Sequence, residues 1–169
     1  YHILLRMGAN LEILNQRSIA GEEIVNLKIS SAKLKGIDLT EEEVLLAIDE
    51  IPILCVAAAF AEGVTRIRGA GELRVKESDR LSMMAELLKA HGFSVTEYDD
   101  GLDIEGGSSL SNLPEQEGAP WQKCGDHRIV MSAAVLSYVL SGSFTIEDLG
   151  EIETSFPNFV ECFQALEPN

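Results

Sequence analysis

The feature that most constrains the fold is a pattern of helix, glycine and strand that occurs more than once along the chain. Residues 4–11 resemble residues 87–95 if one residue is inserted. The alanine-rich segments that end at Gly63 and Gly142 are each followed by a strand-like stretch. Both pairs lie about 80 residues apart, a spacing typical of internal structural repeats. The pattern predicts an α/β fold in which similar units pack around one core.

The expected unit is helix, glycine, strand, helix, glycine, strand, strand, although helix–glycine–strand runs also occur in α/β proteins without repeats. Expected helices cover 1–7, 51–63, 78–91 and 127–140, with a last one starting near Pro157. Expected strands cover 11–14, 23–30, 65–69, 94–98, 102–104 and 144–147. Asp100-Gly101 predicts a tight hairpin turn, and residues 106–118 are expected to form a polar loop.

The charge and length of the chain limit its partners. The 169 residues suffice for one domain with a sizeable core, and the net charge of −15 argues against nucleic acid or an anionic membrane as partner. The most apolar run, 51–61, is far shorter than the roughly 20 residues that span a bilayer. These features leave open a small anionic ligand, which would depend on local charge.

The termini and cysteines carry two further expectations. The chain starts with Tyr1 in what reads as the end of a helix, so we expect it to begin inside a domain, with a segment missing upstream. No signal peptide is visible. The three cysteines are widely spaced, which disfavours a disulfide framework or a zinc site and fits a reducing, cytoplasmic compartment.

Several cations are concentrated in one strand and the loop after it. Of the 13 Lys and Arg residues, this stretch holds Arg66, Arg68, Arg74, Lys76 and Arg80. Arginine binds phosphate and carboxylate groups through paired hydrogen bonds, and the helix expected near residue 78 would direct backbone N–H groups at the same region. The stretch therefore indicates an anion site. The alternative is a solvated strand edge whose charges pair with acidic neighbours.

Two carboxylates are candidate proton carriers beside these cations. Glu77 lies between Lys76 and Arg80, and Asp49 precedes a helix that contains proline in its first turn. A carboxylate among cations can transfer protons to and from a bound anion. Asp49 could instead cap the helix that follows it.

The triplet Asp126-His127-Arg128 adds three candidate groups at the start of a helix. His127 can titrate near neutral pH, Arg128 can hold a second anion, and Asp126 can cap the helix or orient either neighbour. We find no nucleophile triad, Walker loop, dinucleotide fingerprint or metal-ligand spacing. From the residues alone, the chain is an anion-binding α/β domain with groups suited to proton transfer.

Six segments resemble the 5-enolpyruvylshikimate-3-phosphate synthase family in order and spacing. They are SAKLKG (31–36), IDEIP (48–52), AAAFAEG (57–63), ELRVKESDR (72–80), DHR (126–128) and TSFP (154–157). The resemblance implies two similar domains, each built from three βαβαββ units with helices inside and sheets outside. It also implies that residues 1–169 form most of the C-terminal domain, and that the N-terminal domain is absent from this chain.

The implied reaction transfers the enolpyruvyl group of phosphoenolpyruvate to the 5-hydroxyl of shikimate 3-phosphate and releases phosphate. This reaction belongs to the shikimate pathway toward chorismate and aromatic amino acids, and the family includes the glyphosate target. The resemblance implies that the enzyme needs no metal or organic cofactor. We expect a monomeric, cytoplasmic full-length enzyme and an inactive 169-residue chain, because half of the interdomain cleft would be missing.

The resemblance also implies residue roles. Asp49 would accept the 5-hydroxyl proton and contact shikimate 3-phosphate, and Glu77 would exchange a proton at the methylene carbon of phosphoenolpyruvate. Lys76 would bridge both substrates. Arg80 and Arg128 would bind the phosphate and carboxylate of phosphoenolpyruvate, with His127 assisting nearby.

This chain departs from the family at two positions. Thr154 stands where some members carry a lysine, and Glu72 stands where some carry an asparagine. Two alternatives stay open: the related enolpyruvyl transferase that acts on UDP-N-acetylglucosamine, and a non-catalytic α/β repeat domain.

Overall fold

One complete βαβαββ unit spans residues 35–106 of the computed structural model, which describes residues 1–107, 124–142, 146 and 150–165. The first strand of this unit is reduced to two parallel bridges, which pair Lys35 with Glu62 and Asp38 with Arg66. Helices α2 (Glu41–Leu46) and α3 (Ile51–Ala59), joined by the 3₁₀ turn η1 (Ile48–Glu50), lead to β3 (Gly63–Ile67). The turn η2 (Gly71–Val75) and α4 (Arg80–Ala90) then lead to β4 (Ser94–Tyr98) and β5 (Gly101–Gly106).

The three strands of this unit form an antiparallel sheet in the order β3-β5-β4. The expected hairpin is present, but its turn lies one residue earlier than Asp100-Gly101, because Tyr98 pairs with Gly101 and the turn is therefore formed by Asp99 and Asp100. A Cβ atom on Gly101 would lie 1.9 Å from the carbonyl oxygen of Ile67, so the strands can approach only with glycine there.

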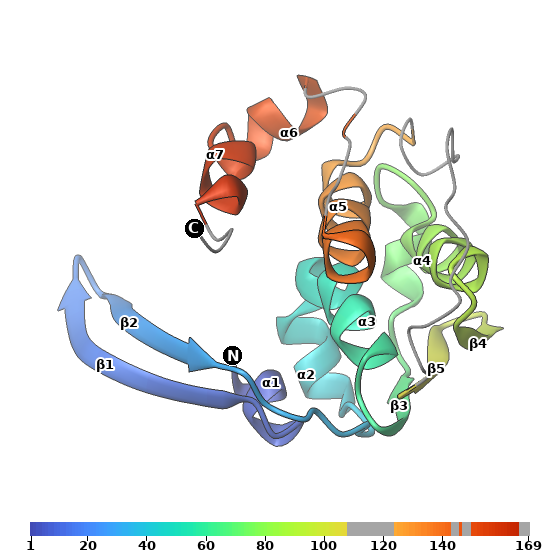
Figure 1. The fold of residues 1–169 in the computed structure, drawn as a ribbon, viewed down its shortest axis with the longest axis horizontal. Coiled ribbons are helices and arrows are strands. Elements are labelled where there is room, and N and C mark those ends of the chain that lie inside the picture. The colour runs from blue at the N-terminus through green and yellow to red at the C-terminus, as the bar shows by residue number, and fades with distance from the viewer. Residues whose placement is uncertain (108–123, 143–145, 147–149, 166–169) are drawn as a thin grey trace.

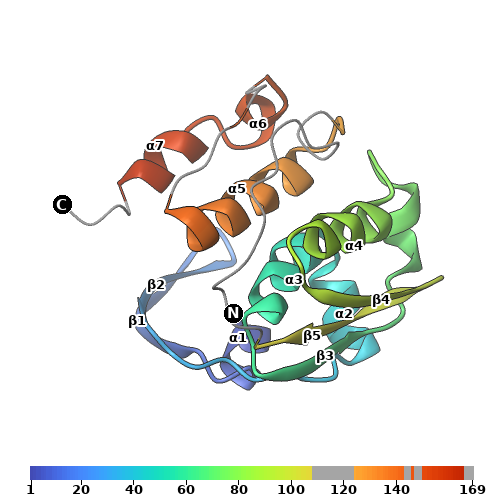
Figure 2. The same ribbon diagram turned by 45° about the vertical axis from the view of Figure 1, so that its right-hand side comes forward.

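Helices lie inside this fold and the sheet lies outside, as the family resemblance implies. Figure 2 shows α3 and α4 on one face of the β3-β5-β4 sheet. Ile67, Leu102 and Ile104 point from that face into the core and are fully buried. Most of helix α3 is buried, because it packs against α4, α5 (His127–Ser141) and β5, whereas Ile53 is exposed. A helix that is apolar all round is stable only in such a central position.

The chain begins with the short helix α1 (His2–Arg6) and a long hairpin of β1 (Asn10–Ile19) and β2 (Glu22–Ser30). Both strands are longer than the expected 11–14 and 23–30, and the register shifts between Ile13 and Gln16. Ala20 and Gly21 have φ angles of 53° and 88°, the left-handed conformation of a two-residue hairpin turn. The hairpin extends away from the helices and exposes most of its residues (Figure 1).

The glycines that define the repeat share one backbone conformation. Gly8 and Gly92 follow α1 and α4 with φ of 90° and 84°, and each precedes a strand. Gly63 and Gly142 follow α3 and α5 with φ of 95° and 73°. Glycine adopts positive φ without the strain that a Cβ atom introduces. The expected strand at 144–147 lies outside the described residues except for Ile146, as does the expected loop from residue 108 onward.

Three short helical elements were not expected from the sequence: α2, η2 and α6 (Gly150–Ser155). The start of α2 had a recognisable signal, because Thr40 and Glu43 form a reciprocal capping box. The helix expected at 78–91 covers Arg80–Ala90, and the helix expected near Pro157 is α7 (Phe159–Gln164). In the part of the chain that the structure describes, no helix is both long and apolar enough to cross a membrane.

Candidate active site

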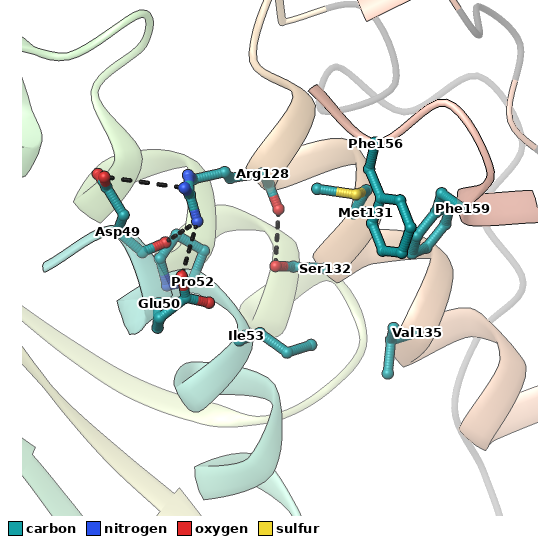
Figure 3. Close-up of a pocket in the computed structure, with 10 residues that line it drawn as sticks. All are labelled: Asp49, Glu50, Pro52, Ile53, Arg128, Met131, Ser132, Val135, Phe156 and Phe159. Atoms are coloured by element: carbon teal, nitrogen blue, oxygen red, sulfur yellow. Dashed lines mark hydrogen bonds and ion pairs between the residues drawn. The ribbon is translucent and has the colours of Figure 1, made fainter. Parts of the chain in front are cut away.

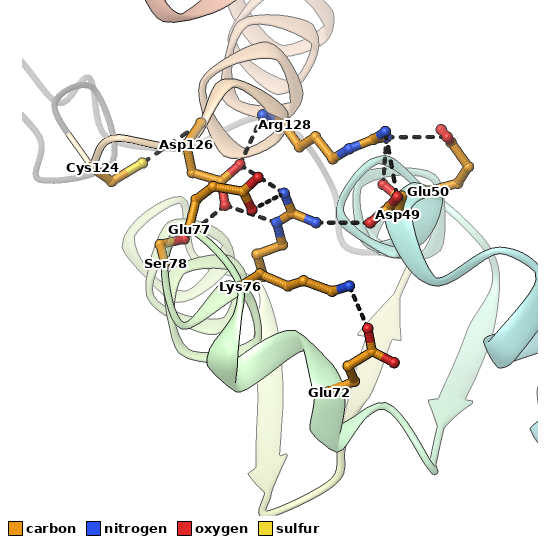
Figure 4. Close-up of polar contacts among 10 residues, drawn as sticks. Asp49, Glu50, Glu72, Lys76, Glu77, Ser78, Cys124, Asp126 and Arg128 are labelled. Carbon is orange, nitrogen blue, oxygen red and sulfur yellow. Dashed lines mark hydrogen bonds and ion pairs between the residues drawn. The ribbon is translucent and has the colours of Figure 1, made fainter. Parts of the chain in front are cut away.

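Three segments far apart in the sequence bring the predicted site residues other than His127 together (Figure 4). Asp49 lies in η1 just before α3, and Lys76 and Glu77 lie between η2 and α4. Arg80 is the first residue of α4, and Arg128 lies in the first turn of α5. The starts of three core helices therefore converge on one point of the surface.

The guanidinium group of Arg80 joins the carboxylates at this point. Its Nε donates to Oδ2 of Asp126 across 2.7 Å, and its Nη2 donates to Oε2 of Glu77 across 2.7 Å. Its Nη1 donates to Oδ1 of Asp49 across 3.1 Å. The Arg80 side chain is 2% exposed, whereas those of Asp49 and Glu77 are 48% and 52% exposed. Arg80 thus holds two candidate proton carriers at the surface from a buried position.

Asp126 is the buried carboxylate of this network and lies against Arg80 in the core. It is the N-cap of α5 and accepts a hydrogen bond from the backbone N–H of Arg128 across 3.0 Å, which confirms the expected capping role. The Ser78 hydroxyl also donates to it across 3.0 Å. Burial disfavours the charged form, but the bonds from Arg80, Ser78 and this amide hold the pKa of Asp126 below its ordinary value. Ser78 was not expected as a site residue, and the sequence held no signal for its contact with a residue 48 positions away.

Arg128 is held against the start of α3. Its Nη1 donates to the backbone carbonyl of Asp49 across 2.8 Å and to Oε1 of Glu50 across 3.1 Å. Its Nη2 lies 3.7 Å from Oδ2 of Asp49. The alternative reading of Asp49 as a helix cap is wrong, because Glu50 occupies the N-cap position of α3 and the carboxylate of Asp49 faces the two arginines.

Lys76 forms an ion pair with Glu72 across one turn of the chain. Its side chain is 25% exposed, and the side chain of Glu72 is 57% exposed. The hydrogen bond that Lys76 donates to Glu72 raises the pKa of Lys76, which keeps the ammonium group charged. Each of the three cations at this site is therefore paired with at least one carboxylate.

The other three arginines of the predicted cluster do not reach the site. Arg66 pairs with Asp38 across 2.9 Å on the outer edge of the sheet. Arg68 donates to the carbonyl of Ile67 across 2.7 Å and stacks on the ring of Tyr98. Arg74 pairs with Asp79 and with Glu97 of β4 (2.8 and 2.9 Å). For these three residues the alternative reading as a charged strand edge is confirmed, and only Lys76 and Arg80 belong to the site.

The N-terminus of α4 is also not free. The helix starts at Arg80 rather than near Ser78, and Oδ1 of the N-cap Asp79 accepts the backbone N–H of Ser82 across 3.1 Å. The expectation that this terminus presents unpaired N–H groups to a ligand is corrected to that extent, because a capping carboxylate satisfies one of them.

Two further positions lie outside the network. His127 is half-buried at the first residue of α5, and its side chain forms no hydrogen bond or ion pair with the other described residues. Thr154 is exposed in α6, and its hydroxyl donates to the carbonyl of Gly150 across 3.2 Å. The structure brings neither side chain to Arg80.

A cavity of about 230 Å³ adjoins the site between α3, α5 and the helices near the C-terminus. Asp49, Glu50 and Arg128 line one end, and Met131, Val135, Phe156 and Phe159 line the other (Figure 3). Within 1–107, 124–142 and 150–165, no three His, Cys, Asp or Glu side chains are grouped so as to hold a metal ion.

Together, the fold and these contacts define an α/β domain with a surface cluster in which two carboxylates lie among cations. The sequence matches the model of the EPSP synthase (3-phosphoshikimate 1-carboxyvinyltransferase) family over residues 1–163. The chain belongs to the EPSP synthase family.

Similar proteins give the same family. The chain is 46% identical over 157 residues to the 3-phosphoshikimate 1-carboxyvinyltransferase of Geobacter metallireducens, covering 93% of this chain and 35% of that protein. It is 44% identical over 164 residues to the 3-phosphoshikimate 1-carboxyvinyltransferase of Synechococcus sp., covering 97% of this chain and 36% of that protein. A crystal structure of EPSP synthase from Acinetobacter baumannii superposes with a TM-score of 0.85 at 42% identity, over 97% of this chain and 37% of that one. The chain thus spans about a third of the length of these relatives.

Proposed function

We propose that this chain supplies half of the active site of an enzyme that transfers the enolpyruvyl group of phosphoenolpyruvate to the 5-hydroxyl of shikimate 3-phosphate, with release of phosphate. The observation that carries the proposal is the position of Asp49 and Glu77, whose carboxylates contact the same guanidinium group at 3.1 and 2.7 Å. Two carboxylates at one point suit a reaction that needs one proton removed and another delivered.

Asp49 and Glu77 have distinct roles in this proposal. Asp49 accepts the proton of the attacking 5-hydroxyl, and Glu77 delivers a proton to the methylene carbon of phosphoenolpyruvate. When phosphate leaves the tetrahedral adduct, a proton returns from that carbon to Glu77, which restores the double bond. Because both carboxylates are about half exposed, substrates can approach them.

The cations bind the charged groups of the substrates. Arg80 and Arg128 bind the phosphate and carboxylate of phosphoenolpyruvate, and Lys76 bridges both substrates. His127 assists from the first turn of α5. Protonation of carbon creates a cationic centre next to the substrate carboxylate, and charges fixed in advance by Asp126 and the helix starts favour that transition state.

We also propose that residues 1–169 form most of the C-terminal domain of a two-domain protein and are inactive alone. The carboxylates are too exposed to exclude water from a reacting intermediate, so a second protein surface has to cover them. The whole protein would act as a monomer in the cytoplasm. Phosphate release from both substrates by the isolated 169-residue chain would contradict the claim of inactivity.

The test is Glu77→Gln in a protein of the relatives' full length. We expect kcat to fall at least about 100-fold, because a positioned proton carrier contributes about 10²–10⁴ to a rate. Glu105→Gln, on an exposed position of β5, is the matched control and should leave kcat unchanged. Unchanged turnover of Glu77→Gln would favour a non-catalytic domain. Phosphate release with UDP-N-acetylglucosamine but not shikimate 3-phosphate would favour the related transferase.

A further inference from the structure

The ion pair of Lys76 and Glu72 lies on a rigid piece of backbone. Glu72 belongs to η2, and Lys76 is the residue that ends it. Leu73 is fully buried between them, and its N–H donates to the carbonyl of Ala70 across 3.0 Å. The N–H of Ala70 in turn donates to the carbonyl of Asp100 across 2.7 Å. The turn is thereby fixed to the β4–β5 hairpin.

Arg74 fixes the same turn from the other side. Its guanidinium group donates to the carbonyls of Asp99 and Tyr98, both across 2.7 Å, and to Glu97 across 2.9 Å. Because the backbone between Glu72 and Lys76 is held at both ends, the two side chains face each other at a high effective concentration.

The Lys76 ammonium group belongs to the site, whereas Glu72 lies at its edge. Figure 4 shows the Lys76 side chain between Glu72 on one side and Asp49 on the other. The charge of Asp49 adds to the larger effect of the hydrogen bond to Glu72 in raising the pKa of Lys76. The Glu72 side chain is 57% exposed, and within the described part of the chain its carboxylate forms an ion pair with Lys76 alone (Figure 4). Exposed ion pairs of this kind are weak and exchange readily with solvent.

We propose that Glu72 is a specificity-determining residue that competes, through its carboxylate, with anionic ligands for the Lys76 ammonium group. This inference rests on the role of Lys76 as a substrate-binding residue proposed above. An anion that contacts Lys76 alone gains little, because it replaces one carboxylate by another. A ligand that carries a second anionic group and reaches Arg80 or Arg128 as well depends less on Lys76, so competition from Glu72 weakens its binding proportionally less. Glu72 thus disfavours anions that bind through a single charged group, such as inorganic phosphate, relative to phosphoenolpyruvate.

The experiment titrates phosphoenolpyruvate and inorganic phosphate into the 169-residue chain and follows the backbone amide of Lys76 by NMR. The variants are Glu72→Gln, Lys76→Met, the double variant, and Glu105→Gln as a control with the same change of charge. Glu72→Gln should lower the Kd for each anion about two- to five-fold, the range set by an exposed ion pair. The Kd should fall by a larger factor for phosphate than for phosphoenolpyruvate. Glu105→Gln should leave both Kd values nearly unchanged. The double variant Glu72→Gln/Lys76→Met should not bind either anion more tightly than Lys76→Met does.

A second readout does not depend on a ligand. The Glu72 hydrogen bond raises the pKa of Lys76, so the Lys76 side chain should titrate at lower pH in Glu72→Gln than in the wild type, as measured at 13Cε. A merely structural role in η2 would lower stability without tightening anion binding. An unchanged titration of Lys76 would show that the pair is absent in solution and would overturn the proposal.

The outcomes separate this inference from the proposed function. If Lys76→Met weakens anion binding but Glu72→Gln fails to tighten it, Glu72 does not compete and Lys76 remains a binding residue. If the wild type binds and Lys76→Met binds equally well, the assignment of Lys76 fails and the competition fails with it. Absence of anion binding in every variant also overturns the competition, because nothing then displaces Glu72.

Discussion

Arg80 and Asp126 form a buried ion pair with 2.7 Å between Nε and Oδ2, and their side chains are 2% and 0% exposed. The pair joins the first residue of α4 to the N-cap of α5. Glu77 precedes Arg80 at the start of α4, and Arg128 follows Asp126 at the start of α5. The pair therefore sets the distance between the start of α4 and the start of α5 at the site. A buried ion pair stabilises little by itself, but loss of one partner leaves an uncompensated charge in the core.

We therefore expect Asp126→Asn to lower the free energy of unfolding by about 3 kcal/mol near pH 7. Asparagine can still cap α5, so the loss comes from Arg80, whose buried charge keeps only the half-exposed partners Asp49 and Glu77. Urea denaturation followed by circular dichroism measures the change. Asp99→Asn, on an exposed turn residue, is the control and should change stability by less than about 0.5 kcal/mol.

The same pair predicts a pH dependence. Although burial favours the neutral acid, Arg80 and the other donors hold the pKa of Asp126 below its ordinary value of 3.8. A depressed pKa contributes stability that is complete above the ordinary value and is lost as the pH falls through the folded-state pKa. The difference in the free energy of unfolding between wild type and Asp126→Asn should have its full size at about pH 6 and be smaller at about pH 3. A difference that grows on acidification would contradict this assignment.

The N-cap of α4, Asp79, should make a second and smaller contribution to the free energy of unfolding. Asp79→Ala removes the acceptor of the Ser82 N–H and should cost about 1 kcal/mol of unfolding free energy. Asp79→Asn keeps a capping side chain and loses only the charge opposite Arg74, so it should cost less than Asp79→Ala. Thermal denaturation of the two variants side by side tests the order, and a costlier Asn variant would show that the ion pair dominates.

Two glycines should respond differently to substitution. A Cβ atom on Gly36 would lie 2.4 Å from the carbonyl oxygen of Val64, so Ala and Asn there should both destabilise by about 1–3 kcal/mol. Gly21 has open space around it and φ of +88°, so Asn should cost less than Ala because Asn tolerates left-handed backbone. Chemical denaturation of the four variants checks this, and a clear advantage of Asn at position 36 would contradict the steric explanation.

The cysteines should differ in reactivity. Burial in α3 raises the pKa of the Cys55 thiol to about 12, and this side chain is inaccessible, whereas Cys162 in α7 is exposed. We expect iodoacetamide at pH 8 to modify Cys162 first and to leave Cys55 intact until the chain unfolds, as measured by mass spectrometry of peptides. Rapid modification of Cys55 under native conditions would show that α3 is not the closed core helix described above.

Local signals explain which parts of the fold were predictable. The ends of α1, α3, α4 and α5 could be predicted because a glycine in the sequence marks each of them. The hairpin near residues 98–102 could be predicted for the same reason, because turns depend on local backbone conformation. The length of the β1–β2 hairpin did not follow from its sequence, because the turn uses Ala20 at positive φ and the strands contain a register shift. Helix α2 carried a capping signal at Thr40 and Glu43 that could have identified it.

The sequence by itself determined the α/β unit, the family and a set of candidate site residues, because periodicity, glycines and motif order are properties of the chain alone. Only the tertiary structure decided which cations serve the site. Arg74 and Arg80 are six positions apart, yet Arg74 turns to β4 and Arg80 to Asp126, which lies 46 residues away from it. Charges act through space, so the partner of each cation depends on how α3, α4, α5 and the sheet pack. For the same reason, the ion pair between Glu72 and Lys76 became apparent only once the fold was known.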